Sequence, residues 1–159
     1  MQLTVGISEM RVSNNPSDVL ITYSLGSCIG VAFYDETVHI GALIHCMLPL
    51  SRIDPQRALI TPCMFADTGV PLALQTMLDM GAEKRRIVAK VAGAAKLLDD
   101  NDTFRIGERN WIVLRKILWK NNILIAAEDT GGSIARTMLL DIATGKTSIK
   151  SRGKQYDLG

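Results

Sequence analysis

The chain has 159 residues, of which 47% are hydrophobic and 21% charged, and its 18 Lys and Arg residues against 16 Asp and Glu residues give a formal net charge of +2. This composition is typical of one folded domain and excludes a disordered chain. Because the charges nearly balance and aromatic residues make up only 5%, we expect no nucleic-acid partner. No apolar run approaches the roughly 18 residues that cross a bilayer, and the N-terminus lacks a signal segment, so we expect a cytoplasmic protein without membrane insertion.

The first half of the chain is rich in short strand patterns. Residues 19–23, 29–34 and 40–47 are apolar runs with many β-branched side chains, and turn residues separate them. Asp35-Glu36-Thr37 predicts a hairpin turn between the second and third runs. As no helical pattern lies between these strands, we expect them to lie in a mixed or antiparallel sheet.

Helical patterns appear in the second half. Apolar spacing predicts one helix that Asp67 or Thr68 caps, with Pro71 in its first turn, and that Gly81 stops, and a second helix over 108–120. The expected fold is α/β: a single-domain layered sandwich with a mixed, largely antiparallel sheet and two main helices. We expect its core to cover about residues 3–150 and to be followed by a polar C-terminal tail over 151–159. Further strands are predicted over 87–92, 123–127, 137–142 and 147–150.

The cysteines are candidates for chemistry. Cys28, Cys46 and Cys63 are an odd number without close pairing, so we expect thiols rather than a disulfide framework. Each thiol is then a small buried hydrophobe, a ligand or a nucleophile.

Cys28 differs from the other two because it leaves a glycine-bearing turn between two predicted strands. Gly26 and Gly30 permit backbone conformations closed to other residues. Successive N–H groups in this turn, at Gly26 and Ser27, could hold a developing oxyanion. A lone cysteine beside an apolar strand is nevertheless more often a core residue than a nucleophile, so both interpretations stay open.

A nucleophilic cysteine needs a base, and the chain has two histidines, His39 and His45. His39 lies near the predicted hairpin turn, where we expect it to be solvated, whereas His45 lies within an apolar strand. Strand alternation places His45 and Cys46 on opposite faces, so Cys46 is assigned to the core. The alternative for His45 is a buried neutral imidazole bonded to the backbone.

The same residues do not predict a metal site. No Cys-x-x-Cys or His-x-x-x-His pair occurs, and alternation separates His45 from Cys46, which leaves at most three candidate zinc ligands. Gly131-Gly132 indicates a turn rather than a nucleotide loop, because no phosphate-binding loop motif occurs. We therefore expect neither a metal nor a cofactor.

Several short motifs occur in an order and spacing that together are specific over about residues 4–150. They are Ser24–Cys28 with His45 seventeen residues later and Met47-Leu48-Pro49 behind it, Phe65–Gly69, Ile106–Asn110, Ala127–Asp129 with Gly131-Gly132, and Thr144–Lys146. This arrangement resembles the CheD family of chemoreceptor glutamine deamidases.

The resemblance implies a single α/β domain and a catalytic set of Cys28, His45 and Thr22, with no cofactor. Thr22 enters through the resemblance alone, since a strand threonine is usually structural. The implied reaction is hydrolysis of specific receptor glutamines to glutamate. A Cys28 thiolate beside a His45 imidazolium would attack the carboxamide, release ammonia and leave a thioester for water to hydrolyse.

The resemblance also implies partners. These are the cytoplasmic domain of a chemoreceptor, as substrate, and the CheC phosphatase. A non-catalytic regulator of receptors or of CheC is therefore an alternative to the enzyme, and another thiol hydrolase is a further one, because one Cys-His pair serves many acyl transfers. The chain departs from the usual family pattern at Cys46, where an aromatic residue is expected, and within Lys90–Ala95.

Overall fold

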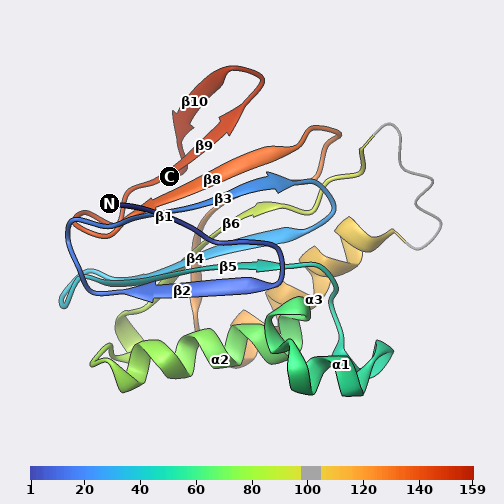
Figure 1. The fold of residues 1–159 in the computed structure, drawn as a ribbon, viewed down its shortest axis with the longest axis horizontal. Coiled ribbons are helices and arrows are strands. Elements are labelled where there is room, and N and C mark those ends of the chain that lie inside the picture. Colours follow the sequence, from blue (N-terminus) through green and yellow to red (C-terminus); the bar gives the residue numbers. More distant parts are fainter. Residues whose placement is uncertain (98–104) are drawn as a thin grey trace.

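Strands from distant parts of the chain form two stacked sheets, and helices cover the outer face of one of them (Figure 1). A computed structural model describes residues 1–97 and 105–159. Sheet A contains, in spatial order, β1 (Gln2–Thr4), β3 (Val19–Leu25), β8 (Arg136–Asp141), β9 (Thr147–Ser151) and β10 (Lys154–Asp157). Sheet B contains β2 (Glu9–Ser13), β5 (Ile40–Cys46), β4 (Ile29–Asp35), β6 (Val88–Gly93) and β7 (Leu124–Thr130).

Most strand pairs are antiparallel. Among the described residues, β1 with β3 and β6 with β7 pair in parallel, and the other pairs run antiparallel. The expected α/β class, the mixed and largely antiparallel pairing and the layered sandwich are confirmed. In sheet A, β3 pairs with β1 and β8, whereas β4 and β5 pair with each other in sheet B. The consecutive strands β3 and β4 therefore belong to different sheets.

The two predicted helices are the longest in the described part of the chain. They are α2 (Ala66–Asp79) and α3 (Ile106–Lys120), and they are accompanied by α1 (Pro55–Ile60) and by the short 3₁₀ helices η1 (Ser51–Ile53), η2 (Pro62–Met64) and η3 (Lys84–Arg86). Pro71 lies inside α2 rather than in its first turn. The Asp67 carboxylate does not cap the helix, because it accepts hydrogen bonds from the Ser51 backbone N–H and hydroxyl at 2.8 and 3.0 Å.

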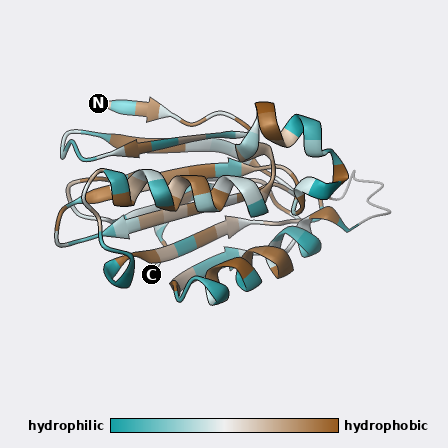
Figure 2. Cartoon of the chain, turned by 90° about the horizontal axis from the view of Figure 1, so that it is seen from below, coloured by the Kyte–Doolittle hydropathy of each residue, from teal (hydrophilic) through white to brown (hydrophobic). Residues whose placement is uncertain are grey.

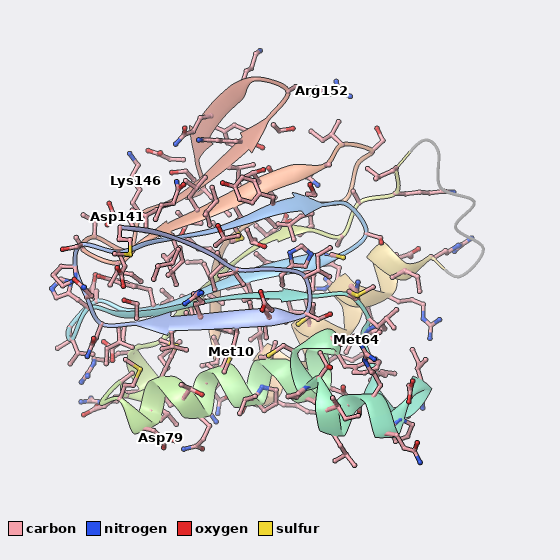
Figure 3. The ribbon with its side chains drawn as sticks, viewed as in Figure 1. Met10, Met64, Asp79, Asp141, Lys146 and Arg152 are labelled. Atoms are coloured by element: carbon pink, nitrogen blue, oxygen red, sulfur yellow. The ribbon has the colours of Figure 1, made fainter. Side chains whose placement is uncertain are left out.

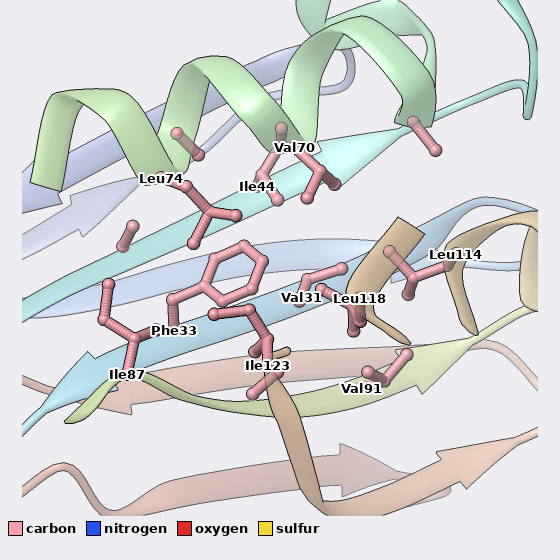
Figure 4. Close-up of a cluster of buried hydrophobic side chains, with 14 of the residues drawn as sticks. Val31, Phe33, Ile44, Val70, Leu74, Ile87, Val91, Leu114, Leu118 and Ile123 are labelled. Atoms are coloured by element: carbon pink, nitrogen blue, oxygen red, sulfur yellow. The ribbon is translucent and has the colours of Figure 1, made fainter. Parts of the chain in front are cut away.

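One part of the core lies between sheet B and the helices. Val31 and Phe33 alternate along β4 and face the helices, where they meet Val70 of α2 and Leu114 and Leu118 of α3 (Figure 4). The intervening residues of β4 and β5 face sheet A instead, and all positions of both strands are buried. Burial on both faces explains why these strands are continuous apolar runs in the sequence.

The helical layer has an outer face open to solvent. Seen from the helix side, hydrophilic and hydrophobic residues alternate along the helices where they cross the strands (Figure 2). Met10 of β2 lies on the helix side of sheet B, next to α2 (Figure 3). No helix in the described part of the chain is long and apolar enough to span a membrane.

The last residues of the chain extend sheet A. Residues 151–159, which the sequence places outside the core as a polar tail, form the end of a hairpin in which β10 pairs with β9. Arg152, at the tip of this hairpin (Figure 3), has φ +52°. Leu158 is buried in the cluster between the sheets, so this single apolar side chain anchors an otherwise exposed segment.

Candidate active site

The candidate residues gather at the end of the molecule where β3, β5 and β6 terminate and α3 begins (Figure 1). Thr22 belongs to sheet A and His45 to sheet B, and Cys28 directly precedes β4 of sheet B, so the site lies between the sheets. No single stretch of sequence contains it.

Strand register places His45 close to the start of β4, which Cys28 directly precedes. Gly30 of β4 is paired with His45 of β5, and Ile29 is paired with Cys46. Cys28 directly precedes β4, two residues before the Gly30 that pairs with His45, so it lies at the same end of sheet B as His45. Cys28 packs against the cluster between the sheets, as does Leu43, which shares a face with His45. As strand alternation predicts, His45 and Cys46 point to opposite sides, since Cys46 packs against the helix-side cluster.

Thr22 contacts His45 across the gap between the sheets. The Thr22 Oγ1 lies 2.7 Å from His45 Nδ1 and donates its hydrogen to the Val5 carbonyl oxygen at 2.8 Å. Because the single hydroxyl hydrogen is directed to a carbonyl, which can only accept, the bond to the imidazole is satisfied when Nδ1–H donates to Oγ1. This arrangement leaves His45 Nε2 unprotonated, with its lone pair available as a base.

His45 is fully buried, and Nε2 has no hydrogen-bond partner within residues 1–97 and 105–159. Desolvation by burial lowers the pKa of His45 to about 4. Burial likewise raises the pKa of the Cys28 thiol, and the Cys28 backbone N–H offsets part of that rise. Desolvation of both groups favours their neutral forms, an imidazole and a thiol, over the imidazolium and thiolate expected from the sequence.

The turn before Cys28 is held through its carbonyl oxygens. Ala95 N–H donates to the Gly26 carbonyl at 2.8 Å, and Ala94 N–H donates to the Cys28 carbonyl at 2.8 Å. These two hydrogen bonds hold the backbone of the 26–28 turn, whose N–H groups include those of Gly26 and Ser27, the donors expected from the sequence.

Glycine is required near this turn for a different reason than the sequence indicates. Gly26 and Gly30 do not have positive φ; the residue that does is Ser24, at +60°. Gly30 is needed for space, because a Cβ there would lie 2.8 Å from Leu25 Cδ1. Gly93 combines φ +102° with a close approach, because a Cβ there would lie 2.4 Å from the Cys28 carbonyl oxygen.

Asn110 of α3, for which the sequence predicted no role, also contacts this region. Its side chain is fully buried, and Nδ2 donates to the Ser27 carbonyl at 2.9 Å and to the Met47 carbonyl at 3.0 Å. The signal in the sequence was a polar residue four positions before Leu114, on the apolar face of the predicted helix.

The remaining thiols and His39 lie elsewhere. Cys46 and Cys63 are buried, and burial raises the pKa of both thiols. His39 is exposed, as expected, and its Nδ1 lies 2.8 Å from the Tyr34 hydroxyl. In the described ranges, no three His, Cys, Asp or Glu side chains converge so as to hold a metal ion.

Comparison with known proteins supports the resemblance. The family model described as CheD chemotactic sensory transduction matches residues 47–151. The probable chemoreceptor glutamine deamidase CheD 1 of Syntrophus aciditrophicus is 53% identical over 149 residues, covering 94% of this chain and 93% of that protein. Its counterpart in Solibacter usitatus is 46% identical over 157 residues, with coverage of 99% and 93%.

A more distant relative aligns over a similar length. The probable chemoreceptor glutamine deamidase CheD of Thermococcus kodakarensis is 37% identical over 158 residues, covering 97% of this chain and 96% of that protein. The family-model match begins after Cys28 and His45, but the relatives align over 94% or more of this chain. On the strength of both comparisons, the chain belongs to the CheD family.

Proposed function

We propose that this protein is a chemoreceptor glutamine deamidase, which hydrolyses glutamine side chains of its receptor substrate to glutamate and releases ammonia. The observation that carries the proposal is the hydrogen-bonded chain from the Val5 carbonyl through Thr22 to His45, which leaves Nε2 unprotonated on the side of sheet B where Cys28 packs. The names of the aligned relatives support the same activity. We place the reaction in the cytoplasm, where thiols stay reduced.

In the first half of the reaction, substrate binding brings the glutamine carboxamide to Cys28. His45 Nε2 accepts the thiol proton as Sγ forms a bond to the carboxamide carbon. The carbonyl oxygen becomes an oxyanion, which the N–H groups of the 26–28 turn stabilise. The protonated imidazole then donates its proton to the leaving nitrogen, the C–N bond breaks, and ammonia and a thioester result.

In the second half, water replaces ammonia. His45 Nε2 accepts a proton from water as the water oxygen attacks the thioester carbon. The C–S bond breaks, the proton returns from the imidazole to Sγ, and glutamate is released. The protein ends in its starting state, so neither a cofactor nor a redox step is needed.

The neutral resting pair suits this sequence of steps. A pKa of about 4 keeps His45 unprotonated at neutral pH, so it is ready to accept a proton. Thr22 holds the ring with Nε2 free, which is the orienting role of the third residue in other catalytic triads.

The test measures ammonia released from a purified chemoreceptor cytoplasmic domain, with mass spectrometry of the receptor. We expect the unmodified protein to convert glutamine to glutamate without cleaving or crosslinking the chain. Cys28→Ala should abolish the conversion, while the matched control Cys63→Ala, a buried thiol outside the site, should retain it. Ammonia release that persists in Cys28→Ala would overturn the covalent mechanism, and no release by the unmodified protein would favour the regulatory alternative that binds receptors or CheC.

A further inference from the structure

We propose that Asn110 is a positioning residue, which holds the Cys28 turn against the end of the strand that carries His45. The inference rests on the proposed deamidation and identifies a further residue on which its geometry depends. Its basis is one side-chain NH₂ group that donates to two backbone carbonyls, those of Ser27 and Met47, at 2.9 and 3.0 Å.

The two carbonyls belong to the two segments that must keep a fixed separation. Ser27 directly precedes Cys28, and Met47 follows His45 by two residues. The backbone ladder between β4 and β5 ends at the pair of Ile29 and Cys46, so Cys28 lies just beyond it. Asn110 connects the Ser27 and Met47 segments just beyond the end of this ladder. Its two hydrogen bonds hold them together where the described residues show no further backbone pairing between β4 and β5.

The orientation of the Asn110 amide is fixed by its partners. A rotation by half a turn would place Oδ1 against two carbonyl oxygens, neither of which can donate a hydrogen bond. In the observed orientation Oδ1 is buried and has no hydrogen-bond partner in the described part of the chain. A buried amide oxygen without a hydrogen-bond donor destabilises the fold. Such unfavourable buried polar groups are expected where a functional site requires them.

The helix that carries Asn110 is itself seated closely on the segment that holds the turn. A Cβ at Gly107 would lie 2.5 Å from the Ala95 carbonyl oxygen, so α3 approaches this segment as only glycine allows. The Ala95 N–H in turn donates to the Gly26 carbonyl. The Gly26 carbonyl therefore accepts a hydrogen bond from Ala95, and the Ser27 carbonyl accepts one from Asn110. Because α3 packs closely on the Ala95 segment, Asn110 is held in a fixed position relative to the turn.

Loss of the two hydrogen bonds should misplace Sγ relative to Nε2 without removing either group. Misplacement on the order of 1 Å can cost about 100-fold in rate. Because Asn110 contacts backbone rather than the reacting atoms, the effect should fall on kcat, with little change in KM.

The experiment compares Asn110→Leu with Asn110→Asp, a variant of the same shape that retains one donor when its carboxyl is protonated. The matched control is Asn121→Leu, which removes an amide from the other end of α3, where Nδ2 donates to the Ile117 carbonyl. Circular dichroism and thermal melting establish that each variant is folded. We expect kcat for ammonia release to fall at least tenfold in Asn110→Leu and less in Asn110→Asp, and to stay unchanged in Asn121→Leu.

A double-mutant cycle with His45→Gln separates positioning from general stability. If Asn110 acts through the spacing of Cys28 and His45, Asn110→Leu should cost little more once His45 has been removed. The rate of Cys28 alkylation by iodoacetamide provides a second readout that requires no receptor. Full kcat in a folded Asn110→Leu variant, or costs that simply add in the cycle, would overturn the inference while leaving the proposed function intact. Activity in Cys28→Ala would overturn both.

Discussion

Thr22 and His45 lie on different sheets, yet Oγ1 of one is 2.7 Å from Nδ1 of the other. This contact fixes the orientation and the protonation of the imidazole at once, because the threonine hydroxyl directs its own hydrogen to the Val5 carbonyl. The site therefore depends on how the two sheets are stacked, and small shifts between them should affect the reaction.

Thr22→Val keeps the shape of the side chain but removes the hydroxyl. If the hydrogen bond to His45 is worth about 1 kcal/mol to the transition state, kcat should fall by roughly fivefold or more. Thr22→Ser should restore part of the loss, because the hydroxyl survives while the β-branch that restricts its rotamer does not. Ammonia release is measured at a temperature where all variants are folded, with Thr137→Val on the neighbouring strand β8 as the control. A fully active Thr22→Val would reduce Thr22 to a strand residue.

Cys28 should be the thiol that iodoacetamide labels first. Cys28 is half-buried, whereas Cys46 and Cys63 are 0% and 6% exposed. Since burial raises the pKa of the Cys28 thiol, its labelling rate should keep rising as the pH is increased above 7 rather than reach a plateau below it. Mass spectrometry of the alkylated peptides over a pH series gives the three rates. A plateau reached at acidic pH would indicate a preformed thiolate and imidazolium, against the neutral pair described above.

His45 should make the fold more sensitive to acid. Its pKa is about 4 in the folded protein, whereas an unfolded histidine has a pKa near 6.5. The unfolded state therefore binds more protons between these values, so the contribution of His45 to stability is complete above about pH 6.5 and is lost as the pH falls toward 4. The pKa shift of His45 corresponds to about 3 kcal/mol of unfolding free energy.

Urea unfolding at pH 7 and pH 4 measures this contribution. The loss of stability over that interval should be smaller in His45→Asn by an amount of the same order, since the amide does not titrate. His39→Asn controls for the removal of an exposed imidazole. Equal losses of stability in the unmodified protein and in His45→Asn would show that the buried imidazole is not the group responsible.

Local patterns in the sequence were sufficient for the elements that carry the site. The apolar runs that became β3, β4 and β5 and the helical spacing of α2 and α3 are periodicities of short segments, and the structure confirms them. The alternation of side chains along a strand was enough to predict that His45 and Cys46 point to opposite faces of β5. The short strands β1 and β2 and the helix α1 were not predicted, because segments of three to six residues carry little periodic signal.

The sequence therefore identified Cys28 and His45 as candidates and predicted that His45 and Cys46 face opposite sides of their strand. The tertiary structure was needed to show that Thr22 contacts His45, that burial lowers the pKa of His45, and that Asn110 joins the turn to the end of β5. The physical reason is that alternation and helical spacing describe neighbours within one segment. Contacts between sheets, and the desolvation that accompanies them, depend on segments 23 and 83 residues apart, whose meeting no local pattern encodes.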